Sequence, residues 1–363
     1  MKAFLIVLFL FVFSFSSFAQ TGKLDVSDTL SYSSSIDPVT DTVPDISIFD
    51  DDTPIDLILK YDITSFIKNK MKSEYIDAEL HIDYNGHETT KNIQLKARGN
   101  RRKEVCFFPP IYLNFKSDPL ETSEMKGIKK IKMVTHCSTS KQSTAYLLKE
   151  FLVYKLYNIL TDNSLRVRLL NITYIDTGKK KRNYEKYGFL IEPVELLTKR
   201  TNSTEIDGSV VRSNNLIEED ADLVALFNYM IGNTDWRFKT GHNMKFIKSL
   251  TEFTQRVIPI PYDFDYSGFV DTHYATPQEW TSIKDVKERE YTGYCREKEE
   301  YVELIELFNA KKDEMLQTID SFDYLPENER NRLNSYINEF FNMAKRPDRL
   351  ASTLRTQCRG EDF

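Results

Sequence analysis

The sequence predicts an α+β protein with two lobes, an N-terminal antiparallel β lobe with one embedded helix and a mainly helical C-terminal lobe. From Pro54 to Val134, short segments rich in β-branched and aromatic residues follow one another without a long helix between them. From Glu218 onward, helical patterns predominate. Consecutive strands without crossover helices form antiparallel sheets, so the two halves of the chain should differ in architecture.

Runs of β-branched and aromatic residues, often alternating with polar ones, define the expected strands of the N-terminal lobe. In chain order these are IDLILKYD, AELHIDY, NIQLKA, PIYLNFK and KIKMV, with a turn at Asn85-Gly86. A long helix is expected over Lys141–Leu160, because its apolar face is wide enough to pack on both sides. Two further strands, RVRLLNITYID and YGFLIEP, flank a basic turn at 178–182.

The C-terminal lobe is expected to contain helices and one hairpin. Glu218–Ile231 has acidic residues in its first turn, where the helix macrodipole favours negative charge. Met244–Lys248 and Arg256–Ile260 have the pattern of a β-hairpin. Glu299–Ile319 and Glu327–Met343 are helical patterns rich in oppositely charged pairs at i,i+4 spacing.

Residues 1–19 have the pattern of a secretory signal peptide. Lys2 supplies a positive charge, Ala3–Phe13 is an unbroken apolar run, and small residues stand at Ser17 and Ala19. The apolar run is too short to favour a membrane anchor, so we expect cleavage after Ala19. No second apolar run reaches spanning length. We therefore expect an exported protein without a transmembrane segment in its mature chain, located in the periplasm, in the medium or on the cell surface.

The remaining chain divides by composition. Residues 20–52 are rich in Ser, Thr and Asp, and we expect them to form a disordered linker. The N-terminal lobe is expected at 53–192, the C-terminal lobe at 193–350 and a tail at 351–363. The formal net charge of −6 argues against nucleic acid as the main partner.

The chain contains 4 cysteines, all outside the expected signal peptide. An even number in an oxidising compartment indicates disulfides. Our preferred pairs are Cys106–Cys137, whose members lie at the ends of expected strands, and Cys295–Cys358. The alternative for the second pair is that Cys358 is free. No CxxC pair is present, which argues against a zinc ribbon or a thioredoxin-like redox site.

The most informative stretch runs from Gly232 to Gly268. Asp235 and Asn243 lie in a polar loop after an expected helix, and Asp263 and Asp265 follow a short strand. Phosphoryl-transfer enzymes of the protein-kinase type have the same order of parts. In these enzymes a loop aspartate orients a hydroxyl, a loop asparagine binds metal, and a further aspartate binds metal.

Several motifs together resemble those of the CotH kinase-like proteins, which are secreted or spore-coat relatives of the atypical protein kinases. The resemblance covers roughly residues 55–268, most of the mature chain, and rests on the order of short motifs. The chain is also similar to a CotH-related group of exported bacterial proteins that share the blocks FPP, MVTHC, GNTDW and YDFDYSG. The matching pieces are ARGN followed by PPIYLNFK, then KKIKMV, YGFLIEP, NTDW with HN, and PYDFDYSG.

The resemblance implies a bilobal kinase-like fold and a role for each matching residue. Asp235 would orient the acceptor hydroxyl. Asn243 and Asp263 would hold metal, and Asp265 would share or replace Asp263. The nucleotide would be contacted by residues of the N-terminal lobe, in which Lys132 reaches the phosphates, Glu150 pairs with that lysine and Glu192 lies at the hinge. Independently of the resemblance, Arg98-Gly99-Asn100 is either a phosphate-facing turn, because glycine lets the backbone approach closely, or a plain hairpin turn.

The chain departs from the ordinary kinase pattern in three ways. Asp235 and Asn243 are eight positions apart rather than five, and Asp263-Phe264-Asp265 stands in place of Asp-Phe-Gly. No GxGxxG loop is present. The choice of lysine therefore stays open, with Lys96 or Lys116 as alternatives to Lys132.

Each candidate also has a structural interpretation. Residues i and i+2 of a strand point to the same side, so Asp263 and Asp265 could share a divalent cation. Otherwise they are turn residues, and two such close carboxylates require a cation or a basic group between them. His242 is either a ligand or base, or a hydrogen-bonded loop residue. Asp235 could simply close the helix through an Asx-turn.

The sequence thus favours transfer of a phosphoryl group from ATP or another nucleoside triphosphate to a hydroxyl group, with Mg²⁺ or Mn²⁺ as cofactor. The acceptor would be an exported protein or a small molecule. Two alternatives stay open. One is a non-catalytic envelope or surface protein that uses a kinase-like fold for binding. The other is a structural domain stabilised by Ca²⁺ at the aspartate pair.

Overall fold

The computed structural model describes residues 47–360 except 85, 121, 123 and 252–254. The expected signal peptide and most of the expected linker lie outside the described residues. The described residues form one compact unit. The two-lobed arrangement expected from the sequence is therefore not clearly present, although two hydrophobic cores can be distinguished.

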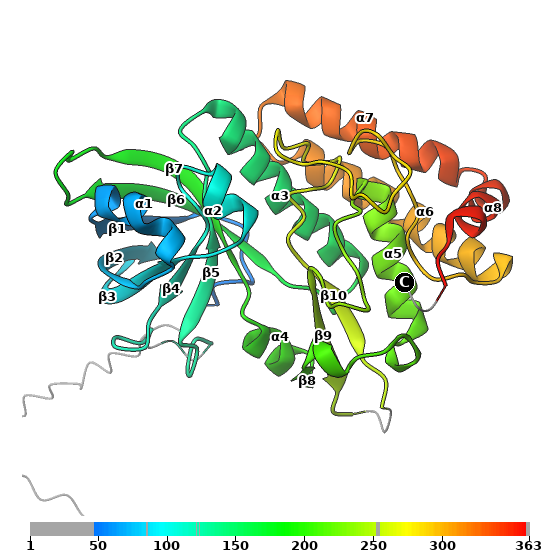
Figure 1. Cartoon of the computed structure of the whole chain (residues 1–363), viewed down its shortest axis with the longest axis horizontal. Helices are drawn as coiled ribbons and strands as arrows, with labels where there is room; N and C mark the ends of the chain where they lie inside the picture. The colour runs from blue at the N-terminus through cyan, green and yellow to red at the C-terminus, as the bar shows by residue number, and fades with distance from the viewer. Residues whose placement is uncertain (1–46, 85, 121, 123, 252–254, 361–363) are drawn as a thin grey trace, which may run out of the picture. The chain divides into compact units, whose positions relative to one another are not determined.

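The N-terminal β region is a closed barrel rather than an open sheet (Figure 1). Its strand order is β1-β2-β3-β4-β5-β7-β6, and β1 pairs in parallel with β6 while the other neighbours are antiparallel. The strands are β1 (Ile55–Tyr61), β2 (Ile76–Tyr84), β3 (His87–Ala97), β4 (Ile111–Asn114), β5 (Lys130–Val134), β6 (Val167–Asp176) and β7 (Tyr184–Ile191). The expected antiparallel sheet is thus wrong at one pairing, the one that closes the barrel.

Strict alternation of buried and exposed residues explains how the barrel is filled. In β1, every second side chain from Ile55 to Tyr61 is buried and the intervening ones are exposed. Leu80, Leu95 and Met133 enter the same interior from neighbouring strands and are fully buried. Since side chains alternate between the faces of a strand, this pattern places one apolar set inside the barrel.

The long helix α3 has the bounds expected from the sequence, Lys141–Leu160. Its first turn is capped by Ser140, whose hydroxyl accepts a hydrogen bond from the Ser143 backbone N–H at 3.1 Å. Such a cap satisfies one of the free N–H groups at a helix start. Three short helices near the barrel were not expected, namely α1 (Ile63–Asn69), η1 (Lys70–Lys72) and α2 (Arg101–Val105).

A second hydrophobic core joins α3 to the C-terminal helices. Val167 and Leu169 of β6 and Phe189 of β7 also belong to this core, so the barrel packs directly against the helical region. The remaining elements are α4 (Val194–Arg200), β8 (Ser203–Ile206), η2 (Gly208–Val210), η3 (Ser213–Asn215), α5 (Glu218–Ile231), β9 (Met244–Ser249), β10 (Ile258–Pro261), α6 (Lys298–Asp320), α7 (Glu327–Ala344) and α8 (Pro347–Gln357). The expected hairpin is present as β9 and β10, and β8 extends it to three strands.

The described part of the expected tail at 351–363 includes most of a helix. Pro347 opens helix α8, which runs to Gln357 and buries Leu350, Ala351 and Leu354. The next residue, Cys358, forms a disulfide with Cys295. The other expected pair, Cys106–Cys137, is also present.

The end of the expected linker packs against the barrel. Ile48 and Phe49 are buried, which a disordered linker would not allow. Asp51 accepts a hydrogen bond from the guanidinium of the fully buried Arg168 at 3.0 Å. Hydrogen bonds from Thr53, and the charge of Arg168, lower the pKa of Asp51 to about 2. The acidic run that looked like a solvated linker therefore fixes the chain at the start of β1.

No helix in the described part of the chain combines the length and the apolar character needed to cross a membrane.

Candidate functional site

The polar loop after α5 begins with a glycine that ends the helix. Gly232 has a φ of 65° and leaves no room for a side chain, because an added Cβ would lie 2.1 Å from the Tyr336 hydroxyl oxygen. Asn233 then accepts a hydrogen bond from the Asp235 N–H at 3.0 Å. The Asx-turn at this helix end is therefore made by the side chain of Asn233 and not by that of Asp235, which the structural interpretation expected.

Three side chains surround the Asp235 carboxylate. Its Oδ1 lies 2.9 Å from His242 Nε2 and accepts a hydrogen bond from Gln278 Nε2 at 2.8 Å. Its Oδ2 accepts from Asn243 Nδ2 at 3.0 Å. The hydrogen bond to Asp235 raises the pKa of His242 above its ordinary value. These contacts fix the Asp235 carboxylate in one orientation.

The structure brings Asp263 to the same loop. The Tyr262 N–H donates to the backbone oxygen of Asn243 at 3.0 Å, and the Asp263 N–H donates to the Tyr154 hydroxyl at 2.9 Å. Strand β10 ends at Pro261, and Asp263 has a φ of 65°. The expectation that Asp263 and Asp265 lie on one side of a strand is therefore wrong, because the chain has left the strand before it reaches them.

A guanidinium lies between the two aspartates. Arg102 Nε donates to Asp265 Oδ2 at 2.6 Å, and one terminal nitrogen of Arg102 lies 3.5 Å from Asp263 Oδ1. The same nitrogen donates to Glu150 Oε2 at 2.6 Å. Glu150 therefore pairs with Arg102 and not with the expected Lys132. A basic group between the aspartates is one of the two possibilities that the sequence left open.

The surroundings shift the pKa values of Glu150, Asp263 and Asp265 in different directions. Burial raises the pKa of Glu150 to about 8, despite the attraction of Arg102. Burial also raises the pKa of Asp265. For Asp263, the charges of Arg102, Arg98 and Lys132 outweigh the effect of burial and lower the pKa. Asp263 is therefore the member of the cluster that keeps its negative charge most readily.

Lys132 lies close enough to Asp263 for its charge to act on that carboxylate. Its Nζ is 4.5 Å from the centre of the Tyr262 ring. Burial lowers the pKa of Lys132 to about 8, and the nearby charges of Arg98 and Lys245 act in the same direction. Mutually repelling cations in one place are expected where an anion binds.

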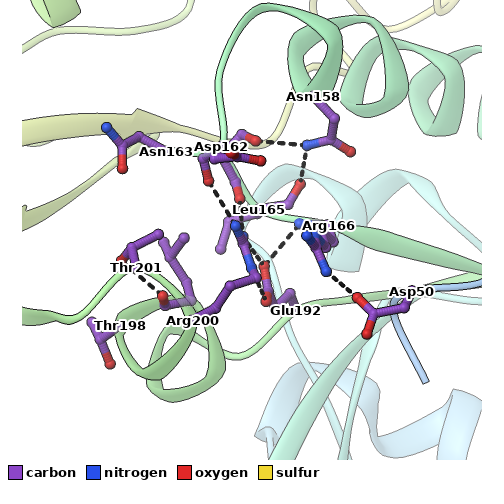
Figure 2. Close-up of polar contacts among 12 residues, drawn as sticks. Asp50, Asn158, Asp162, Asn163, Leu165, Arg166, Glu192, Thr198, Arg200 and Thr201 are labelled. Carbon is purple, nitrogen blue, oxygen red and sulfur yellow. Dashed lines mark hydrogen bonds and ion pairs between the residues drawn. The ribbon is translucent and has the colours of Figure 1, made fainter. Parts of the chain in front are cut away.

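Figure 2 shows the protein groups that bind the Glu192 carboxylate. Glu192 is buried, and its carboxylate accepts two hydrogen bonds from Arg200, at 3.2 and 2.9 Å. It also accepts from the Arg166 backbone N–H at 3.0 Å. These bonds join the end of β7 to α4 and to the start of β6, so the Glu192 carboxylate is already satisfied by protein groups.

In the part of the chain that the structure describes, no group of three or more His, Cys, Asp or Glu residues is arranged to hold a metal ion. The expected ligands fit a metal only in part. Asp265 is buried and already accepts from Arg102 and from the Tyr274 hydroxyl, the latter at 2.8 Å. The Asp263 side chain is 35% exposed. The amide nitrogen of Asn243 donates to Asp235, which leaves its oxygen for a cation. Asp263 and Asn243 are therefore the ligands that fit.

Comparisons with known proteins give little further information. No family model and no curated protein matches this chain. Among solved structures, it is similar to the crystal structure of a Helicobacter pylori proinflammatory kinase, CtkA, with a TM-score of 0.35 and 10% identity, over 76% of this chain and 91% of that chain. A similarity at this level carries no argument about function, and the resemblance to the CotH family stays a prediction.

Sequence reasoning did not single out Arg102, Gln278 or Tyr274 as site residues. Arg102 stands in a short basic cluster of the kind that is usually solvated. Gln278 and Tyr274 belong to an irregular segment in which no periodic pattern is present. The only available signal was the Asp263–Asp265 pair itself, since two close carboxylates require a positive neighbour.

Proposed function

We propose that the protein is a kinase-like phosphotransferase that transfers a phosphoryl group from a nucleoside triphosphate to a hydroxyl group. One observation carries the proposal. Asp235, Asn243 and Asp263 belong to two separate loops, and they are joined by hydrogen bonds from Asn243 to Asp235 and from Tyr262 to Asn243. An acceptor-orienting aspartate and two metal-binding groups are the parts that such a reaction needs close together.

The basic groups beside Asp263 have the properties of a phosphate site. Lys132 and Arg98 approach it from the barrel, and their charges act on the Asp263 carboxylate. A phosphate that accepts hydrogen bonds from these two cations would relieve the repulsion between them. Arginine can bind phosphate through two nitrogens, whereas lysine provides a single positive charge.

The chemical roles follow from this arrangement. Asp235 orients the acceptor hydroxyl and takes up its proton, while His242 and Gln278 keep the carboxylate in place. Asn243 and Asp263 would hold the Mg²⁺ or Mn²⁺ ion, which when bound would neutralise charge on the phosphates. Positioning and charge neutralisation supply most of the catalysis in phosphoryl transfer.

We further propose that the protein acts outside the cytoplasm. The two disulfides, Cys106–Cys137 and Cys295–Cys358, are compatible with an oxidising compartment. Export would restrict the acceptor to an exported protein or to a small molecule that carries a hydroxyl group.

Replacing Lys132 by glutamine is expected to weaken ATP binding by about 10- to 100-fold, because a hydrogen bond to a charged group contributes about 1.5–3 kcal/mol. Lys129→Gln is the matched control, since Lys129 is exposed and precedes the same strand. Isothermal titration of both variants with ATP and Mn²⁺ checks the prediction. Equal ATP affinities in the two variants would rule out the assigned phosphate site.

The alternative of a non-catalytic binding protein is favoured by a specific observation. The Arg102 guanidinium contacts both aspartates where a second catalytic cation would be expected. Nucleotide binding without any phosphoryl transfer would support this alternative.

A further inference from the structure

Three large apolar side chains are exposed on the part of the surface where η1 packs against α2 and β3. Met71 of η1 is 56% exposed, Phe107 after α2 is 48% exposed, and Tyr75 before β2 is 41% exposed. They make up three of the 9 large hydrophobic residues that are exposed in the described part of the chain. Single exposed apolar residues are ordinary, whereas a group of them marks an interaction surface.

A hydrogen bond between the two short helical segments brings Met71 and Phe107 to the same part of the surface. Lys70 Nζ donates to the Cys106 backbone oxygen at 2.5 Å. Met71 and Phe107 directly follow the two residues that this bond joins. Cys106 also forms the disulfide with Cys137, so the backbone that carries Phe107 is held in place. The exposure of these side chains therefore belongs to a fixed part of the fold.

Basic side chains surround the three apolar ones. Lys103 Nζ donates to the Ser73 hydroxyl at 2.9 Å, and Lys96 Nζ lies 5.3 Å from the centre of the Tyr75 ring. The cations of segments 62–75 and 101–107 that are exposed or half-buried are Lys68, Lys70, Lys72, Arg101 and Lys103. The acids of these segments are Asp62, Glu74 and Glu104, of which Glu104 is paired with Arg101 at 3.1 Å. This part of the surface is therefore positively charged, although the whole chain has a formal net charge of −6.

Apolar side chains among lysines suit the boundary region of an anionic lipid bilayer. There the apolar side chains enter the layer between head groups and acyl chains, and the lysines contact acidic head groups. A tyrosine is favoured at the same depth, because its ring is apolar and its hydroxyl is polar. A nucleic acid would satisfy the lysines but would leave Met71 and Phe107 in water. An anionic bilayer is therefore the partner that both kinds of side chain fit.

We propose that this surface binds the protein to membranes that contain anionic phospholipids. The apolar contacts come from Met71, Tyr75 and Phe107, and the attraction to the lipid head groups comes from the lysines around them. Because the lysines are at the surface, the binding should weaken as the salt concentration rises. The proposal does not depend on the phosphotransferase function, since none of these three apolar residues belongs to the candidate functional site.

The test is co-sedimentation of the expected mature chain, from residue 20, with phosphatidylcholine vesicles that contain or lack phosphatidylglycerol. The expected signal peptide must be absent, because its apolar run would itself bind lipid. The wild type should bind only the vesicles that contain phosphatidylglycerol. Met71→Ser/Phe107→Ser should weaken this binding by about tenfold, because less apolar surface enters the bilayer. Lys68→Gln/Lys72→Gln should weaken it by about 10- to 30-fold.

Val210→Ser/Leu250→Ser is the matched control for the apolar variant. Val210 and Leu250 are even more exposed than Met71 and Phe107, but they belong to other segments of the chain. Their replacement should leave vesicle binding unchanged. All the replaced side chains are exposed, so every variant should melt within a few degrees of the wild type.

Equal vesicle binding by Met71→Ser/Phe107→Ser and by the Val210→Ser/Leu250→Ser control would overturn the proposal. It would also be overturned if the wild type bound both kinds of vesicle equally or bound neither. Self-association that Met71→Ser/Phe107→Ser abolishes, in a protein that does not bind vesicles, would assign the surface to a contact between two copies of the chain instead. ATP binding is measured without lipid, so failure of the membrane proposal and failure of the phosphotransferase proposal can be told apart.

Discussion

Replacement of Asp235 by asparagine is expected to lower phosphoryl transfer by about 10²- to 10⁴-fold, the usual effect of removing a general acid or base. The asparagine Oδ1 can still accept the hydrogen bonds from His242 and Gln278. Its Nδ2 cannot accept from Asn243 Nδ2, but that nitrogen keeps its hydrogen bond to the backbone oxygen of residue 235, so the loop should keep its conformation. The affinity for ATP should therefore stay within about threefold of the wild type, because the assigned partner of Asp235 is the acceptor hydroxyl and not the nucleotide. The measurement is the rate of transfer from γ-labelled ATP to water or to the protein itself.

Asp271→Asn serves as the control for this experiment. Asp271 has an exposed carboxylate that pairs with Lys287 at 3.0 Å, and we assign it no part in the reaction. Its replacement should leave the transfer rate unchanged. If Asp235→Asn retains the activity of this control, Asp235 does not have the assigned role.

The second large effect concerns the stability of the protein in acid. His136 is completely buried between Phe108 and Tyr174, and neither ring nitrogen has a hydrogen-bond partner among the described residues. Burial, together with the charge of Lys186, lowers the pKa of His136 to about 3 from the ordinary value of 6.5. The folded protein therefore holds this ring in its neutral form.

The sign of the pH dependence follows from this lowered pKa. Below pH 6.5 the unfolded chain binds a proton at His136 that the folded chain does not bind until about pH 3. The contribution of the neutral His136 ring to the free energy of unfolding is complete above pH 6.5 and is lost as the pH falls. Linkage gives a loss of about 3 kcal/mol between pH 7 and pH 4 from this residue alone.

His136→Phe is expected to remove this part of the acid sensitivity. The free energy of unfolding, measured by urea denaturation at pH 7 and pH 4, should fall less in this variant than in the wild type. His273→Phe is the control, because His273 is exposed. The same loss of stability in His136→Phe and in His273→Phe would contradict the assignment.

The elements with strong local signals were predicted well. Helices α3 and α5 have the bounds expected from the sequence, because a serine cap or an acidic first turn marks the start of each helix and its apolar residues recur with helical spacing. Barrel closure could not be predicted in this way. The parallel pairing of β1 with β6 aligns Ile55 with Leu170, and no local pattern specifies a partner so distant in the sequence.

The same distinction applies to the candidate site. The order of Asp235, Asn243 and Asp263 indicated one site, and the hydrogen bonds of Asn243 join its parts. The partner of Glu150 was predicted as Lys132 and is Arg102. Both are basic residues before α3, and only the tertiary arrangement decides which of them reaches the carboxylate. The positive φ at Asp263 was also not predicted, because the sequence there looks like a strand.

The most direct test of the central claim, that Asp235, Asn243 and Asp263 form a nucleotide–metal site, is a thermal-shift titration with ATP and Mn²⁺, singly and together. The titration should use the expected mature chain from residue 20. A chain shortened to the end of the expected linker would lose Ile48 and Phe49, which are buried against the folded unit. We predict a stabilisation that requires both ligands, equivalent to about 2.7 kcal/mol at 100 times the dissociation constant, and that disappears in Asp263→Ala. No shift with ATP and Mn²⁺ in a well-folded wild-type sample would contradict the claim, and stabilisation by Ca²⁺ alone would indicate a structural metal site instead.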